Sequence, residues 1–213
     1  MLTTAAPLVF VVDDNPSVRK SLGRLLALAG YRVEEFASAR EFLTRGSPEG
    51  PCCLVLDVRM PGLTGIELQE TLAAAKRRMS IVFVTGHVDV PTSVKAMKGG
   101  AIDLLTKPID REALLSAIAR AVAKDAASLS EELRVAEIRQ RVETLTVRET
   151  QVFALVVTGM LNKQIASVLG VGLKTIKVHR AKVMAKMRAR SMAELVRLAD
   201  AAGVHAGVAQ AVA

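Results

Sequence analysis

The chain has 213 residues, of which 51% are apolar and 23% are charged, an ordinary balance for one or two globular domains with full hydrophobic cores. No apolar run approaches the roughly 18 residues of a membrane helix, and Met1 to Pro7 lacks the basic flank and apolar segment of a secretory signal, so we expect a cytoplasmic protein. Residues 1–138 contain 17 basic and 17 acidic residues, so the net charge of +8 lies in residues 139–213, and a basic C-terminal unit favours nucleic acid over a membrane as partner.

The first 123 residues alternate short apolar runs with amphipathic segments. We predict strands at 8–12, 31–36, 52–57, 81–85 and 102–106, and helices at 16–29, 38–45, 64–75, 90–98 and 110–123. Repeated strand-helix units with short connections predict an α/β doubly wound fold with a five-stranded parallel sheet. Cys52 and Cys53 are adjacent in a strand and therefore point to opposite faces, so we expect two buried, unpaired thiols in a reducing compartment.

Polar side chains follow four of the predicted strands. Asp13 and Asp14 follow the first strand, and Asp57 ends the third. Thr85 ends the fourth strand, and Lys107 follows the fifth. In an open sheet of strand order 2-1-3-4-5, these ends meet in one crevice. Crowded carboxylates repel one another unless a cation is present, so the set predicts a site for Mg²⁺ and a phosphoryl group, with Asp57 as the nucleophile.

Residues 124–143 are mostly helical in pattern and highly charged, with a thin apolar stripe. We expect a helical linker between a first domain at 1–123 and a second domain at 144–202. The linker either continues the preceding helix or begins a new helix capped near Ser128 or Ser130, and the sequence leaves both possibilities open.

The last third is helical throughout. Thr146 and Glu149 form a capping box that opens a helix to about residue 158, and further helices are predicted at 162–169, 173–188 and 191–202. The short turn Gly170 to Gly172 between two of these four helices predicts a helix-turn-helix. We expect residues 203–213 to form a flexible tail.

Helix 173–188 has two different faces. Ile176, Val183 and Met187 share one face, which we expect in the core. The opposite face carries small and basic residues, namely Lys174, Val178, Ala181 and Ala185, flanked by Lys177, Lys182 and Arg188. Small residues allow close approach to base edges, Val178 suits a thymine methyl group and the flanking cations suit phosphates, so this pattern predicts a DNA-recognition helix.

Four motifs, at residues 11–14, 56–62, 85–87 and 106–108, resemble the receiver domain of bacterial two-component response regulators. The resemblance implies that a partner sensor histidine kinase phosphorylates Asp57. It also implies that Asp14, Asp57 and the main-chain carbonyl of Arg59 bind Mg²⁺, while Asp13 assists through water. Aspartyl phosphohydrolases often place a second Asp at the position of Arg59, so we expect no enzyme activity beyond self-phosphorylation and self-dephosphorylation.

The resemblance extends to the switch residues. It implies that Thr85 moves toward the phosphoryl group, that Lys107 contacts it, and that the Lys107-Pro108 peptide is cis. Leu104 stands where the family usually has Phe or Tyr, so a ring flip cannot report the movement of Thr85.

Residues 145–149, 162–166 and 174–180 are similar to the LuxR/NarL-type DNA-binding domain, and the whole chain most resembles the FixJ subfamily of response regulators. The resemblance implies that Lys177 and Val178 enter the major groove, near Lys174, Ala181 and Lys182, while His179 either contacts phosphate or packs inward.

We expect phosphorylation to promote a homodimer through the face formed by residues 90–98, 102–106 and 110–123, with double-stranded DNA and RNA polymerase as further partners. The alternative is a DNA-binding regulator whose receiver works without phosphorylation.

Overall fold

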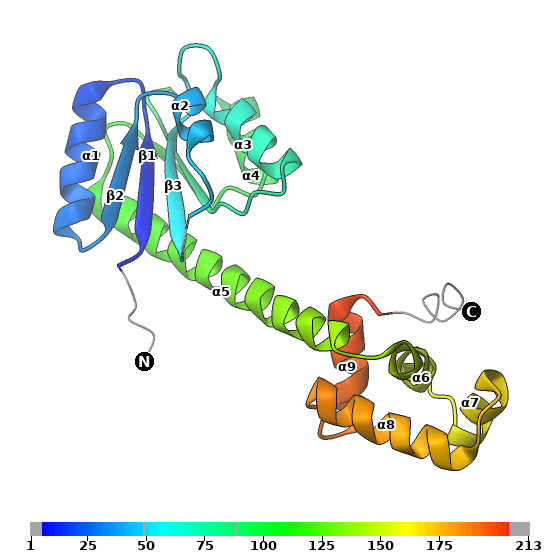
Figure 1. Cartoon of the computed structure of the whole chain (residues 1–213). Helices are drawn as coiled ribbons and strands as arrows, with labels where there is room; N and C mark the ends of the chain where they lie inside the picture. Colours follow the sequence, from blue (N-terminus) through cyan, green and yellow to red (C-terminus); the bar gives the residue numbers. More distant parts are fainter. Residues whose placement is uncertain (1–5, 49, 88, 205–213) are drawn as a thin grey trace. The chain divides into compact units, whose positions relative to one another are not determined.

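The computed structural model describes residues 6–48, 50–87 and 89–204. These residues form two compact units with a boundary between Ser130 and Glu131 (Figure 1). Within the described residues, no helix combines the length and apolar character needed to cross a membrane.

The first unit contains a five-stranded parallel sheet of order β2-β1-β3-β4-β5, as predicted. Its strands are β1 (Leu8–Val12), β2 (Arg32–Phe36), β3 (Cys52–Asp57), β4 (Ile81–Thr85) and β5 (Asp103–Thr106). The helices between them are α1 (Pro16–Leu28), α2 (Ala39–Thr44), α3 (Gly65–Ala74) and α4 (Val90–Lys98), and α5 (Arg111–Glu143) follows β5. The doubly wound α/β fold is therefore confirmed.

Two hydrophobic cores lie on the two faces of this sheet. Helices α2, α3 and α4 cover one face, and helices α1 and α5 cover the other (Figure 1). Because β1, β3 and β4 are buried on both faces, their sequences are runs of apolar residues rather than alternating, apart from Asp57 and Thr85 at the ends of β3 and β4. Cys52 and Cys53 lie in different cores, both buried and unpaired, which confirms the prediction that they point to opposite faces.

Helix α5 runs without interruption from Arg111 to Glu143. This settles the question that the sequence left open, because no new helix begins near Ser128 or Ser130. Residues 124–143, the expected linker, form the second half of α5 and lie on both sides of the boundary between the units. Asp125 in this segment is buried at 1% exposure within the first unit.

The second unit is helical, with α6 (Val147–Val157), α7 (Asn162–Leu169), α8 (Leu173–Met187) and α9 (Met192–Ala202), as predicted. Thr146 and Glu149 form the expected capping box at the start of α6. Gly170 ends α7 in the left-handed conformation, with φ of 64°, and Gly172 caps α8, so a tight turn joins these two helices. Of the expected tail, Gly203 and Val204 follow α9, and residues 205–213 lie outside the described residues.

Candidate functional site

Three carboxylates meet at the carboxyl ends of β1 and β3. These strands are parallel neighbours with Val12 opposite Leu56, so the residues that follow Val12 lie beside Asp57. Asp13 and Asp57 are buried and Asp14 is exposed. One oxygen of each carboxylate lies within 4.8 Å of the others. The sheet therefore places the three predicted acidic residues in one cluster.

Lys107 joins this cluster from the end of β5. Its Nζ donates hydrogen bonds of 2.7 Å to Asp13 Oδ2 and 2.7 Å to Asp57 Oδ2. The Lys107 N–H donates to the Thr85 carbonyl oxygen at 2.8 Å, and the Lys107-Pro108 peptide is cis, as expected. The ammonium thus bridges two carboxylates that come from different strands.

Burial and ion pairing act in opposite directions on these charges. Burial raises the pKa of Asp57, and the hydrogen bond from Lys107 opposes this shift without cancelling it. Burial also disfavours the charged form of Lys107, but its hydrogen bonds to Asp13 and Asp57 outweigh this effect, so the pKa of Lys107 is raised. Lys107 consequently remains an ammonium at neutral pH and balances one of the three carboxylates.

The donor set fits a divalent cation of the magnesium type. All three side chains offer carboxylate oxygens, the ligands that Mg²⁺ prefers. Two of the carboxylates are held in place from the backbone, since Asp13 Oδ1 accepts from the Asn15 N–H at 2.9 Å and Asp57 Oδ1 accepts from the Arg59 N–H at 3.1 Å. Among the described residues, Lys107 is the one cation that pairs with these carboxylates, so the cluster keeps the excess negative charge that a divalent ion would neutralise.

Thr85 ends β4 and Leu104 lies within β5, and neither has a described hydrogen bond to the cluster. The Thr85 hydroxyl donates to the His87 carbonyl oxygen at 2.9 Å and accepts from the His87 N–H at 3.3 Å, so its described hydrogen bonds stay within its own loop. Leu104 is half-buried, lies opposite Phe83 in the sheet and packs against the core formed with α2, α3 and α4.

Gly65 is a site residue that the sequence reasoning missed. A Cβ at this position would lie 2.1 Å from the main-chain oxygen of Asp57, so only glycine allows α3 to start so close to the end of β3. The Gly65 N–H donates to the Val58 carbonyl oxygen at 3.0 Å, which closes the loop after Asp57. The available signal was a glycine directly after the capping residue Thr64, where a helix former is expected.

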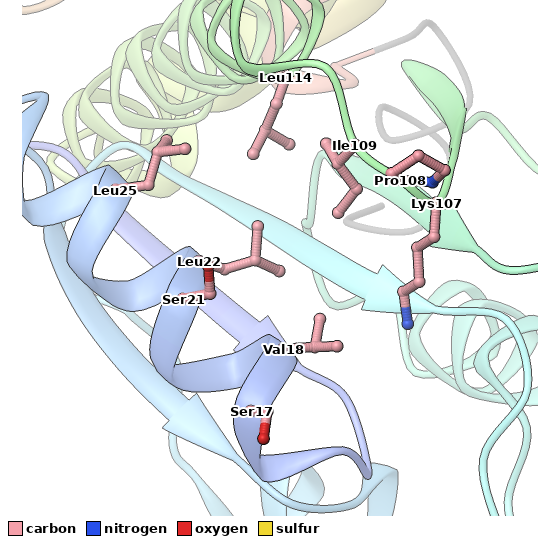
Figure 2. A pocket seen from close by; sticks show the side chains of 9 residues that line it. All are labelled: Ser17, Val18, Ser21, Leu22, Leu25, Lys107, Pro108, Ile109 and Leu114. Carbon is pink, nitrogen blue, oxygen red and sulfur yellow. The ribbon is translucent and has the colours of Figure 1, made fainter.

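A pocket of about 360 Å³ is lined in part by Lys107. Figure 2 shows residues of α1 on one side of this pocket and residues 107–109, after β5, with Leu114 on the other. Its lining is mostly apolar and includes the hydroxyl residues Ser17 and Ser21. None of its lining residues is acidic, and Lys107 both lines the pocket and bonds to Asp13 and Asp57.

Helix α8 exposes the side chains predicted to contact DNA. Ile176, Val183 and Met187 are buried in the core of the second unit, as predicted. The opposite residues are exposed, namely Lys174, Lys177, Val178, Ala181 and Lys182, and Val178 is 48% exposed. These side chains form one basic surface with a small apolar centre.

His179 and Arg180 lie at the edge of this surface. His179 is half-buried, and its Nδ1 is buried without a hydrogen-bond partner among the described residues, so one ring nitrogen faces inward. Arg180 donates to Asn162 Oδ1 at 2.8 Å and so ties α8 to the start of α7.

Glu149 and Lys186 tie the opposite end of α8 to α6. Glu149 is 3% exposed and accepts from Lys186 Nζ at 2.6 Å and from the Thr146 N–H at 2.9 Å. These bonds, with the Lys186 ammonium first, hold the pKa of Glu149 at about 2. The orientation of α8 in the unit thus depends on polar contacts at both ends.

Comparison with known proteins identifies two domain families. Residues 9–119 match the response regulator receiver domain, and residues 143–199 match the bacterial regulatory proteins of the luxR family. Nodulation protein W of Bradyrhizobium diazoefficiens is 45% identical over 199 residues, which are 93% of this chain and 88% of that protein. The transcriptional regulatory protein FixJ of Azorhizobium caulinodans is 44% identical over 92% of this chain and 93% of its own length.

Two solved structures extend over both domains. The response regulator StyR is 47% identical, with a TM-score of 0.80, and the match covers 92% of this chain and 99% of that chain. Full-length FixJ from B. japonicum is 41% identical, with a TM-score of 0.54, and the match covers 92% of this chain and 97% of that chain.

Proposed function

Since the chain belongs to the FixJ subfamily of response regulators, transcription factors that join a receiver domain to a LuxR-type DNA-binding domain, we propose that a partner sensor histidine kinase phosphorylates Asp57 and thereby controls binding to double-stranded DNA. The observation that carries this proposal is the geometry of Lys107, which bonds to Asp13 and Asp57 in a cluster of three carboxylates. A nucleophile, a cation and a metal-ligand set then serve one phosphoryl group.

In the proposed reaction, a carboxylate oxygen of Asp57 attacks the phosphorus of a phosphohistidine. The new O–P bond forms as the P–N bond breaks, and the histidine of the kinase leaves. Lys107 is within reach of the transferred oxygens because its ammonium already bonds to Asp57. Mg²⁺ held by Asp14, Asp57 and the Arg59 carbonyl, with Asp13 assisting through water, would neutralise charge on the phosphoryl oxygens.

Thr85 would then give up its contacts with His87 and donate its hydroxyl to the phosphoryl group. Because Leu104 has no ring to flip, we propose that repacking of α4 and β5 follows this movement directly. The surface that changes carries exposed apolar residues on one side of α4, namely Val90, Val94 and Met97, which are 75%, 45% and 48% exposed. Exposed apolar groups of this kind mark interaction surfaces, which supports a phosphorylation-dependent homodimer through α4, β5 and α5.

The proposed output is binding of a two-fold operator by paired α8 helices. Lys177 and Val178 would read bases in the major groove, near Lys174, Ala181 and Lys182, and His179 would offer its outward ring nitrogen to a phosphate. We further propose RNA polymerase as the partner of the DNA-bound dimer and the cytoplasm as the location of this exchange.

The test is phosphate uptake from a small phosphodonor with Mg²⁺ by the whole chain. Asp57→Asn is expected to abolish acid-labile phosphate and the increase in molar mass that follows phosphorylation, measured by light scattering. The matched control is Asp200→Asn, since Asp200 is an exposed residue of α9, outside the receiver and outside the proposed homodimer face.

Stoichiometric, acid-labile phosphate on the Asp57→Asn variant would contradict the assignment of Asp57. If the wild-type chain binds operator DNA fully but takes up no phosphate, the receiver works without phosphorylation. The position of Leu104 and the inward contacts of Thr85 are the observations that would favour this second function.

A further inference from the structure

Asp125 is a buried carboxylate that has no part in the proposed phosphorylation chemistry. It lies on α5, is 1% exposed, and its Oδ2 accepts a 2.8 Å hydrogen bond from the N–H of Cys52. Cys52 is the first residue of β3, and Asp57 is the last. Asp125 therefore contacts the opposite end of the strand that carries the phosphorylation site.

Arg78 holds Asp125 in place from a third segment, the connection between α3 and β4. Its guanidinium forms an ion pair with Asp125 Oδ2, and its Nη1 also donates to the main-chain oxygen of Asp125 at 3.0 Å. The Arg78 guanidinium thus contacts both the side chain and the backbone of Asp125. The start of β3, the α3–β4 connection and α5 are joined at this single point.

The stability of the fold does not by itself explain this ion pair. A buried carboxylate costs free energy, and packed apolar residues of similar size often stabilise a fold at least as well as a buried ion pair. Asp125 Oδ1 has no hydrogen-bond partner among the described residues, so the carboxylate is only partly compensated. Buried ionic groups of this kind are best known for fixing the register or position of one element against another.

The position of α5 matters because this helix belongs to both units. It continues from Asp125 to Glu143 without a break, and Ile138 on the same helix is buried in the core of the second unit. A change in the contacts of Asp125 with Cys52 and Arg78 would therefore act on the helix that continues into the DNA-binding domain.

We propose that Asp125 and Arg78 are positioning residues that couple Asp57 to α5 through β3. The inference rests on the proposed phosphorylation of Asp57. The pair holds α5 against the start of β3 in the unphosphorylated receiver, and rearrangement at the Asp57 end of β3 changes this hold. Since Leu104 removes the usual ring flip, this junction supplies a connection to α5 that does not pass through β5.

The test compares operator affinity before and after phosphorylation with a small phosphodonor, in the whole chain. For Asp125→Asn, which keeps the shape of the side chain and removes its charge, the ratio of the two affinities is expected to fall at least about fivefold, the lower end of ordinary coupling effects. Phosphate uptake by Asp57 is expected to match the wild type, a result that loss of folding would not produce. The matched control is Lys124→Ala, because Lys124 is an exposed neighbour of Asp125 on the same helix. This variant is expected to show the wild-type ratio of operator affinities.

A double variant, Asp125→Leu with Arg78→Met, removes the ion pair without leaving an unpaired buried charge. Its ratio of operator affinities after and before phosphorylation is expected to fall as far as that of Asp125→Asn. An affinity ratio equal to the wild type in either folded variant overturns the inference. If the wild type itself takes up no phosphate, or phosphorylation leaves its affinity unchanged, the proposed function fails instead.

A second measurement needs no variant. Hydrogen exchange at the Cys52 amide is expected to be slow in the unphosphorylated wild type, because Asp125 protects this N–H, and to accelerate on phosphorylation. Exchange that is unchanged by stoichiometric phosphorylation would also overturn the inference.

Discussion

At the scale of single residues, the acidic site depends on hydrogen bonds to Asp57 and on one close backbone contact at Gly65. Asp57 is held by Lys107 on one side and by the Arg59 N–H on the other. Behind it, the absence of a side chain on Gly65 lets the first turn of α3 touch the Asp57 carbonyl oxygen. The nucleophile is thus positioned by close packing as well as by charge.

Gly65→Ala is expected to destabilise the receiver by about 1–3 kcal/mol, although alanine is the better helix former, because the new Cβ would overlap the Asp57 main-chain oxygen. Urea unfolding of the whole chain measures this change. Gly46→Ala is the control, since a Cβ there meets nothing within 4 Å. Equal effects from the two substitutions would mean that the contact at Gly65 is readily relaxed.

A second prediction at this scale concerns acid stability. The pKa of Glu149 is about 2 in the folded protein and 4.5 ordinarily, so the folded state favours the ionised form. Its contribution to the unfolding free energy is complete above about pH 4.5 and is lost as the pH falls toward 2. Glu149→Gln is expected to lower the free energy of unfolding by about 1.5–3 kcal/mol at neutral pH. The difference from the wild type is expected to shrink as the pH falls from about 4.5 toward 2.

Denaturant unfolding between pH 2 and pH 7 checks this expectation, with the exposed Glu143→Gln as control. A constant difference between wild type and Glu149→Gln across the range would show that the ion pair with Lys186 does not contribute through its charge.

At the scale of elements, α8 and α4 each have one buried face and one exposed face. Helix α8 buries Ile176, Val183 and Met187 and exposes Lys174, Lys177 and Lys182, so one periodic sequence specifies both the packing and the proposed recognition surface. Helix α4 exposes the apolar residues Val90, Val94 and Met97, which form part of the proposed homodimer surface.

Lys177→Ala is expected to weaken operator binding by about 1–3 kcal/mol, with a smaller loss on unrelated DNA, because the side chain is proposed to contact bases. Fluorescence anisotropy with operator and unrelated duplexes at several salt concentrations measures both losses. Lys20→Ala removes the same charge from an exposed position on α1 and serves as control. Equal losses of binding free energy on both duplexes would indicate that Lys177 contacts a phosphate rather than a base.

At the scale of the whole molecule, two compact units with separate cores share one helix. Each unit carries a different candidate site, so ligands of the two sites act on different folding units. Most of the net charge lies in the second unit, since residues 139–213 carry a net charge of +8.

We therefore expect two thermal transitions in calorimetry. Mg²⁺ at a hundred times its dissociation constant would stabilise the receiver transition by about 2.7 kcal/mol, while operator DNA would raise only the other transition. Chelation of Mg²⁺, or Asp14→Asn, should remove the first effect and leave the second. A receiver transition that does not respond to Mg²⁺ would argue against a metal site at Asp13, Asp14 and Asp57.

Much of this organisation could be predicted from the sequence because it depends on local patterns. Apolar runs of strand length, the Thr146–Glu149 capping box and the 3.6-residue period of α8 are properties of short segments. The acidic site was also predictable, because parallel strands bring their carboxyl ends together once the strand order is assumed.

The tertiary structure decided what depends on contacts between distant segments. The sequence alone determined the strand-helix order and the cluster of carboxylates with Lys107, but it could not show that α5 is continuous or that Asp125 is buried against Cys52, 73 positions away. The same holds for Gly65, where a side chain is excluded because the main-chain oxygen of Asp57 lies beside it. Local propensity is encoded within a few residues, whereas burial and close approach depend on which segments pack together.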